Sequence, residues 1–162
     1  GPADPAHRVR RPAREGRLMA KLRRGERSGL EDIELTWPGS PFGDRLVELV
    51  LEGTKTATCS RLAEWEAEGR EPPTPGSRTA LIDMAGRERG VVEVTEVRVV
   101  PIREIDDDFA RAEGEGFEDV ARWRAAHEEF WTSDQPGVKV TDETMIVAER
   151  IRLVERFDQG HG

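Results

Sequence analysis

The chain has 162 residues, of which 36% are hydrophobic and 36% charged, and its net charge is -8. This length suits a single domain with a core large enough to fold without disulfides or metals. No apolar run approaches the roughly 18 residues of a membrane span, and no signal-peptide pattern is present, so we expect a cytoplasmic protein without membrane contact. Cys59 is the only cysteine, which excludes an intrachain disulfide and argues against a cysteine-based zinc site.

The charge is unevenly distributed along the chain. Residues 1–30 contain nine Lys/Arg and three Asp/Glu, a net charge of +6, which leaves -14 for residues 31–162. We expect residues 1–30 to form a flexible basic arm, residues 31–157 the folded domain and residues 158–162 a tail. The arm is either a solvated tail or a contact for nucleic-acid phosphates. The acidic domain favours a small ligand or one nucleotide over a broad nucleic-acid surface.

The first predicted element is a helix over residues 42–52, in the segment SPFGDRLVELVLEG. Its apolar residues recur at helical spacing, a Ser-Pro pair precedes it, and Gly53 ends it. The next segment, TKTATCS, is typical of a short strand because threonine has a high β-propensity. LAEWEAEG then predicts one or two turns of helix ending at Gly69. Prolines place the following segment, REPPTPGS, in a loop.

The segment RTALIDMAGRERGVVEVTEVRVVPI predicts a β-hairpin, with strands at about 79–84 and 91–100. The second strand changes phase along its length, because valines 92 and 94 share one face of a regular strand and valines 97 and 99 share the other. A bulge near Thr95 would bring all four to one face and would also curve the strand, as in small barrels.

The remaining elements complete an α+β fold. REIDDDFARAEGEG predicts a short helix followed by a glycine-broken turn, and FEDVARWRAAHEEFWTS predicts a helix over residues 117–131 with one apolar stripe. ETMIVAERIRLVERF predicts a last strand at about 144–155, bent or divided. Because this order does not repeat as βαβ units, we expect a small, mostly antiparallel β-barrel with the two longer helices packed outside.

Lys55 is the first candidate for chemistry. A lysine becomes a useful base when burial lowers its pKa, and a nearby threonine hydroxyl then becomes a plausible nucleophile. Lys55 and Thr58 would lie on opposite faces of a regular strand, so they converge only if the strand begins irregularly at Thr54 and Lys55. An ordinary strand that uses threonines for β-propensity explains the same segment.

Two further features are candidates. His127 is the only histidine outside the predicted arm and tail, which contain His7 and His161, and its place on the apolar stripe indicates a core or pocket-wall residue rather than a catalytic triad. The sequence EGEG at 113–116 contains glycines that allow tight backbone turns near a ligand. On composition alone, a loop with solvated glutamates is the favoured explanation of EGEG.

Taken together, the motifs resemble the ASCH domain family, whose fold is PUA-like. The residues that carry the resemblance are GTKTAT after an apolar helix, then VEVTEVRVVPIREI, FARAEGEG and the W…H..F pattern of the longer bacterial members. The resemblance covers roughly residues 36–156. It implies a small β-barrel with a cleft beside the lysine segment, suited to RNA or nucleotide-like ligands.

The resemblance also implies roles for individual residues. Some compact relatives are amidohydrolases that deacetylate acetylated cytidine with a lysine, a threonine and a glutamate, which match Lys55, Thr58 and Glu115. No metal and no cofactor are expected. The candidate substrate-binding residues around this catalytic group are Thr54, Thr56, Cys59, Ser60, Glu113, Trp123 and His127.

This chain departs from the compact pattern in its N-terminal extension, its EEFWTSDQPG segment and the Cys-Ser pair after Thr58. Three functions therefore remain open: hydrolysis of a modified nucleoside, metal-independent RNA cleavage, and RNA binding without catalysis. In the first, Thr58 attacks the acyl carbonyl, Lys55 accepts its proton, and Glu115 relays that proton to the leaving amine. In the second, Lys55 stabilises phosphorane charge and the basic arm holds the strand. The sequence leaves the oligomeric state open.

Overall fold

The computed structural model describes residues 23–36 and 40–158. Its elements lie close to the predicted positions, including the predicted short helices. In chain order they are α2 (Gly43–Leu51), β1 (Ala57–Arg61), α3 (Leu62–Ala67), β2 (Arg78–Ile82), β3 (Glu88–Pro101), the 3-10 helix η2 (Ile102–Glu104), α4 (Asp107–Ala112), α5 (Val120–Asp134) and β4 (Met145–Arg156). Even α5, with 15 residues, is too short to span a bilayer, and the same holds for the other described helices.

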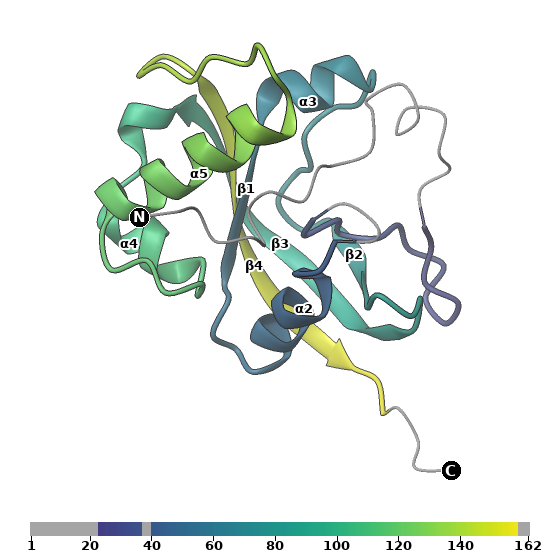
Figure 1. The fold of residues 1–162 in the computed structure, drawn as a ribbon. Helices are drawn as coiled ribbons and strands as arrows, with labels where there is room; N and C mark the ends of the chain where they lie inside the picture. The colour runs from purple at the N-terminus through teal and green to yellow at the C-terminus, as the bar shows by residue number, and fades with distance from the viewer. Residues whose placement is uncertain (1–22, 37–39, 159–162) are drawn as a thin grey trace.

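The four strands form one curled antiparallel sheet in the order β1-β4-β3-β2 (Figure 1). This confirms the predicted α+β class and the mostly antiparallel sheet. Among the described residues, β1 and β2 are the two edges and do not pair with each other, so the sheet is a half-barrel and the predicted closed barrel is not observed. A parallel bridge between Asp32 and Ala80 instead continues the sheet beyond β2.

The predicted bulge in β3 is confirmed. The register with β4 shifts between Val94 and Glu96, so that Val94 lies opposite Ile151 while Val97 lies opposite Glu149. Because residues 149 and 151 share a face of β4, the valines on both sides of the bulge face the same way. The last strand, β4, is continuous over 12 residues rather than divided. Its length lets it pair with both β1 and β3.

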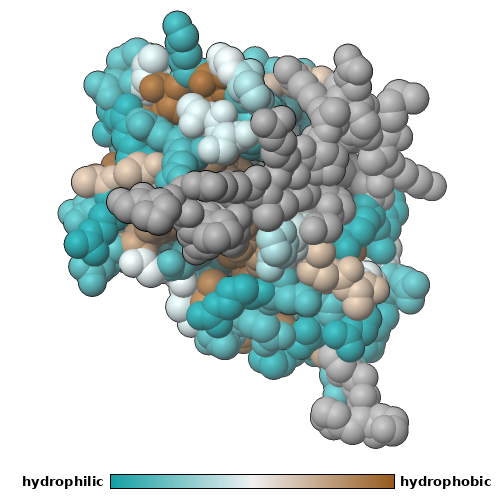
Figure 2. Space-filling model, in the orientation of Figure 1, coloured by the Kyte–Doolittle hydropathy of each residue, from teal (hydrophilic) through white to brown (hydrophobic). Residues whose placement is uncertain are grey.

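Apolar side chains on the two faces of the sheet form separate core clusters. On one face, Ile146 and Ala148 of β4 pack with α4 and α5, where Trp123 is the largest buried side chain. On the other face, Ile151 packs with residues of α2, β2 and β3. The alternation of even and odd positions along β4 separates the clusters. On the face shown in Figure 2, the coloured surface is mainly hydrophilic, with small separate hydrophobic patches.

The described part of the predicted arm contacts the folded domain. Arg23 pairs with Asp32 at 2.7 Å and donates a hydrogen bond to the carbonyl of Asp83. The backbone amides of Arg27 and Ser28 donate to Glu88 in β3. Residues 23–30 are therefore tied to the β2–β3 hairpin, and the folded domain includes residues on the N-terminal side of the boundary predicted at 31. Residues 1–22, with His7, and 159–162, with His161, lie outside the described residues.

We predict that Arg23→Ala lowers the free energy of unfolding by about 1–3 kcal/mol, because it removes the ion-pair partner of an Asp32 side chain that is only 5% exposed. The control is Arg24→Ala, which breaks a solvent-exposed pair with Glu31 and should cost less than about 1 kcal/mol. Urea denaturation of the full chain measures both. Equal losses for the two variants would contradict the structural role of Arg23.

Candidate functional site

Lys55 lies in the turn between α2 and β1, not within the strand. The amides of Thr54 and Lys55 both donate to the carbonyl of Leu49 at 3.0 Å, and β1 begins only at Ala57. Strand alternation therefore does not separate Lys55 from Thr58. The Lys55 residue is only 3% exposed. Its ammonium contacts a carboxylate oxygen of Glu115 at 2.9 Å and donates to the carbonyl of Glu113 at 3.3 Å.

The EGEG loop packs directly on the lysine turn. Gly114 has a φ of +71°, and a Cβ there would lie 2.4 Å from the carbonyl oxygen of Thr54 and 2.8 Å from the Lys55 Cα. Only glycine allows this conformation and this approach. On the other side of the turn, the amide of Thr56 donates to the carbonyl of Ala112 at 2.8 Å. These contacts bring Glu113 and Glu115 to a lysine about 60 residues earlier in the chain.

Lys55, Thr58 and Glu115 line one small cavity of about 170 Å³. Cys59, Glu113 and His127 also line this cavity, and its remaining walls are mainly apolar side chains from α2, α5 and the neighbouring loops. The Glu115 side chain is 31% exposed, so the Lys55–Glu115 pair connects a buried ammonium to solvent. The structure thus brings the three candidate catalytic residues together.

The charges in this cavity compensate one another. Burial lowers the pKa of Lys55, but the negative charges of Glu113 and Glu115 raise it by more, so the lysine is held in its ammonium form. Burial raises the pKa of Glu113, but the charges of His127 and Lys55 lower it by more, so its carboxyl is ionised. The sequence-based idea of a lysine that burial makes neutral is therefore wrong for the free protein.

His127 is a wall of the cavity, and its orientation is fixed on both sides of the ring. Its Nδ1 lies 2.7 Å from the carbonyl of Trp123, which can only accept, so Nδ1 carries a proton. Its Nε2 lies 3.4 Å from a carboxylate oxygen of Glu113. Burial lowers the pKa of His127, but Glu113 raises it by more, which favours the imidazolium. The Trp123 ring stacks on the imidazole with centroids 4.4 Å apart.

Within residues 23–36 and 40–158, one group could hold a metal ion. It consists of Cys59, Glu113 and His127, whose potential ligand atoms lie within 4.8 Å of one another. A metal requires the thiolate, the carboxylate and a neutral imidazole. Burial, followed by the charge of Glu113, raises the pKa of the Cys59 thiol well above its ordinary value, and Lys55 already balances the charge of Glu113. In the free protein the Cys59 thiol is therefore protonated, and a metal ion bound here would displace that proton.

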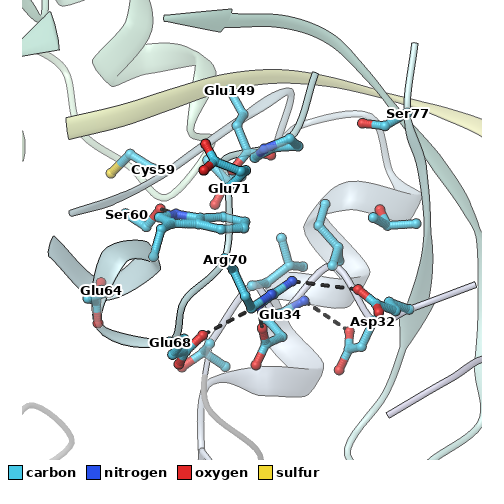
Figure 3. Close-up of a pocket in the computed structure, with 18 of the residues that line it drawn as sticks. Asp32, Glu34, Cys59, Ser60, Glu64, Glu68, Arg70, Glu71, Ser77 and Glu149 are labelled. Atoms are coloured by element: carbon cyan, nitrogen blue, oxygen red, sulfur yellow. Dashed lines mark hydrogen bonds and ion pairs between the residues drawn. The ribbon is translucent and has the colours of Figure 1, made fainter. Parts of the chain in front are cut away.

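A larger cavity of about 440 Å³ adjoins the small one (Figure 3). The two cavities share wall residues, including Thr58, Cys59, Phe130 and Trp131. Seven carboxylate side chains line the larger cavity but only three arginines do. The carboxylates belong to Glu31, Asp32, Glu34, Glu64, Glu68, Glu71 and Glu149, and the arginines are Arg24, Arg70 and Arg78.

The most connected of these arginines, Arg70, is held by carboxylates and an aromatic ring. It contacts Glu34 at 3.2 Å and Glu68 at 3.4 Å, as Figure 3 shows. Its guanidinium lies 4.9 Å from the Trp65 ring centroid. The Trp65 indole nitrogen in turn donates to the Ser60 hydroxyl at 2.8 Å, which fixes the ring against β1. The larger cavity therefore combines a negative lining with an oriented aromatic side chain.

Sequence reasoning missed Glu149, which is only 7% exposed and lines the larger cavity. It lies opposite Thr58 in β1 and Val97 in β3. Burial raises its pKa to about 7, although the positive charge of Lys55 acts in the other direction. A signal was present in the sequence, because Glu149 alternates with Val147 and Ile151 and so occupies an inward position of a strand.

Not every predicted substrate-binding residue reaches a cavity. Cys59, Glu113 and His127 line the small cavity, and Ser60 lines the larger one. Thr54 and Thr56 are exposed and line neither, and Trp123 is fully buried in the core behind His127. The apolar stripe of α5 therefore supplies both core and cavity residues.

We predict that Gly114→Ala lowers the free energy of unfolding by roughly 1–3 kcal/mol more than Gly116→Ala. Both glycines have positive φ, but only at position 114 would a Cβ collide with backbone, while nothing lies within 4 Å of a Cβ at 116. Chemical denaturation measures the free energy of unfolding of both variants. Both include the cost of a positive φ at alanine, so their difference gives the cost of the collision at position 114. Similar losses would show that the loop does not need to approach Lys55 so closely.

A second prediction concerns pH. The pKa of Glu149 rises from 4.5 to about 7 on folding, so the folded state holds a proton that the unfolded chain has lost. The stability from this group is present below about pH 4.5 and is lost as the pH rises through 7. The free energy of unfolding of Glu149→Gln should therefore rise by about 3 kcal/mol relative to that of the wild type as the pH increases from 4 to 8.

Urea denaturation across this pH range measures the gain. Glu71→Gln is the matched control because it removes an exposed carboxylate that lines the same cavity. If the difference in stability between wild type and Glu149→Gln is constant with pH, Glu149 does not hold a proton in the folded protein.

Comparisons with known proteins agree with this architecture. An ASCH domain family model matches residues 37–155. Among solved structures, the ASCH domain from Lactobacillus crispatus is similar with a TM-score of 0.62 and 26% identity, over 70% of this chain and 72% of that chain. A protein from Enterococcus faecalis is similar with a TM-score of 0.61 and 25% identity, over 69% of this chain and 68% of that chain. No match to a curated protein was found.

The match to the family model spans well over half of the chain and contains the lysine turn, the EGEG loop and His127. The chain therefore belongs to the ASCH domain family.

Proposed function

We propose that this protein binds a nucleoside or nucleotide unit of RNA at the Lys55 cavity and hydrolyses an acyl group from a modified nucleoside such as acetylated cytidine. The observation that carries the proposal is the joint position of Lys55, Thr58 and Glu115 on one cavity, with Lys55 and Glu115 in contact at 2.9 Å. Membership in the ASCH domain family, which is linked to RNA binding, supports the nucleotide-like ligand.

The reaction begins with the buried ion pair. Because Lys55 is an ammonium in the free protein, it first passes a proton to the Glu115 carboxylate along their contact. A ligand that excludes water from the cavity favours the neutral pair, since desolvation penalises both charges. Lys55 is then an amine that can accept a proton, and Glu115 is an acid that can donate one.

In the next step, the Thr58 hydroxyl oxygen attacks the acyl carbonyl carbon and its proton passes to Lys55. The carbon–nitrogen bond breaks, and the leaving amine takes the proton from Glu115. The acyl group is now an ester of Thr58. Water attacks this ester by the same proton transfers, which releases the carboxylic acid and restores the threonine hydroxyl.

The electrostatics of the site favour a nucleoside over a polyphosphate strand. The larger cavity next to Thr58 has seven lining carboxylates, and residues 31–162 carry a net charge of -14. Phosphate groups bind where Lys and Arg gather, and nucleic-acid surfaces are usually basic. Hydrolysis of a modified nucleoside therefore fits the site better than RNA cleavage.

We predict that Lys55→Ala slows deacetylation of acetylated cytidine by at least about 100-fold, as expected when an acid–base group is removed. Lys139→Ala is the control, because that lysine is exposed and lines neither cavity. Thr58→Val should also lose turnover, while Thr56→Val, two residues along the chain, should retain it. Chromatography of cytidine formed over time measures the rates, and thermal melting checks that each variant folds.

The same proteins are incubated with a single-stranded RNA oligonucleotide. Full turnover of acetylated cytidine by a folded Lys55→Ala variant would contradict the catalytic assignment. RNA fragments without deacetylation would replace the proposal with ribonuclease activity. Saturable RNA binding without either product would replace it with a binding module.

A further inference from the structure

The larger cavity has features that the proposed reaction does not use. The acyl group and its scissile bond need only the small cavity of about 170 Å³, whereas ligand sites for whole small molecules occupy about 300–1,000 Å³. The adjoining cavity of about 440 Å³ begins at Thr58 and is large enough for a base and its sugar. A ligand that reacts at Thr58 can therefore extend into it.

Glu149 is a buried carboxyl on the wall of this cavity that the proposed reaction does not use. Its side chain has no hydrogen-bond or ion-pair partner among residues 23–36 and 40–158, and Lys55 acts on it only through charge. Figure 3 shows it on the side of the cavity away from Arg70, close to β1. A buried carboxyl without a partner costs stability, so it indicates a ligand that supplies the missing hydrogen bonds.

We propose that Glu149 binds the amidine edge of a nucleobase, in which a ring nitrogen accepts and the neighbouring amino group donates a hydrogen bond, as in cytosine. The inference rests on the proposed function and deepens it, because the register pair Thr58–Glu149 places this edge beside the nucleophile. One proton lies between the carboxyl and the ring nitrogen, and one carboxyl oxygen accepts from the amino group.

The lining of the cavity explains why an amidine is favoured over a carbonyl-rich base. An amidine edge gains positive charge when it shares a proton with a carboxyl, and seven carboxylates with only three arginines stabilise that charge. Uracil has no basic ring nitrogen, so it acquires no positive charge that these carboxylates could stabilise. Trp65, held by its hydrogen bond to Ser60, provides an aromatic face of the kind on which bases stack.

Charged groups around Glu149 come from several neighbouring elements. Lys55 precedes β1, and its charge is the one that acts on the carboxyl. The partners in the sheet, Thr58 and Val97, carry no charge. Across the cavity, the charged lining groups are Glu64 and Glu68 of α3, Arg70 and Glu71 of the following loop, Arg78 of β2, and Arg24, Glu31, Asp32 and Glu34 of the N-terminal segment.

The test is calorimetric titration of the full chain with cytidine and with uridine between about pH 5.5 and 8.5. Cytidine carries no acyl group, so binding is measured independently of turnover. We expect cytidine to bind more tightly than uridine, with an affinity that falls about tenfold per pH unit above pH 7, because the shared proton is lost. Glu149→Gln should bind cytidine without this pH dependence, since its amide supplies one donor and one acceptor at every pH.

Glu149→Leu should lose about tenfold or more of the cytidine affinity at pH 6. The control is Glu129→Gln, which removes an exposed carboxylate that lines neither cavity and should keep the wild-type pH profile. Equal affinity for cytidine and uridine, a flat pH profile of the wild type, or the same slope in Glu149→Gln would overturn the assignment. A protein that shows the predicted binding but does not deacetylate would overturn only the proposed hydrolysis. Deacetylation without the predicted binding would overturn only the role of Glu149.

Discussion

The site depends on the compensation of one buried positive charge, the ammonium of Lys55. An ammonium removed from water without partners costs several kcal/mol even after relaxation. Here the carboxylate of Glu115 and the carbonyl of Glu113 contact it directly, and the charge of Glu113 acts in the same direction. The close approach of Gly114 to the lysine turn makes these contacts possible. Burial and charge balance thus explain why a lysine, a tight glycine loop and two glutamates occur together.

The local features of the fold were predictable from the sequence because their causes are local. The change of phase among the β3 valines indicated the bulge, and apolar spacing located α2 and α5 to within a few residues. Closure of the barrel was not predictable. Hairpin and strand signals identify which segments are strands, but they do not determine whether edge strands β1 and β2 meet. The bridge to Asp32, which continues the sheet beyond β2, has no strand pattern in the sequence.

The site was predictable only in part, for similar reasons. The order of motifs identified Lys55 and Glu115, and the structure places them in contact. The apolar stripe on α5 contains both Trp123, which is in the core, and His127, which lines the cavity. Helical spacing shows which face of a helix a residue lies on, but it does not show how deeply the residue is buried. The charge state of Lys55 is a balance between burial and two carboxylates, and sequence gives no distances with which to compare them. The alternation of Glu149 with Val147 and Ile151 indicated an inward position, but the sequence did not show that this position lines a cavity next to Thr58.

The bulge at Thr95 also limits how this family member can change in length. Elsewhere in the chain, an insertion in a surface loop changes only the loop. One residue added to or removed from β3 between Val94 and Val97 would instead turn every following side chain of the strand to the opposite face. Val97 and Val99 would then leave the face that contains Glu149, and Arg98 and Val100 would replace them, which brings a charged side chain to this apolar stretch. Natural variation by insertion and deletion should therefore avoid this short segment even where its individual residues are freely substituted.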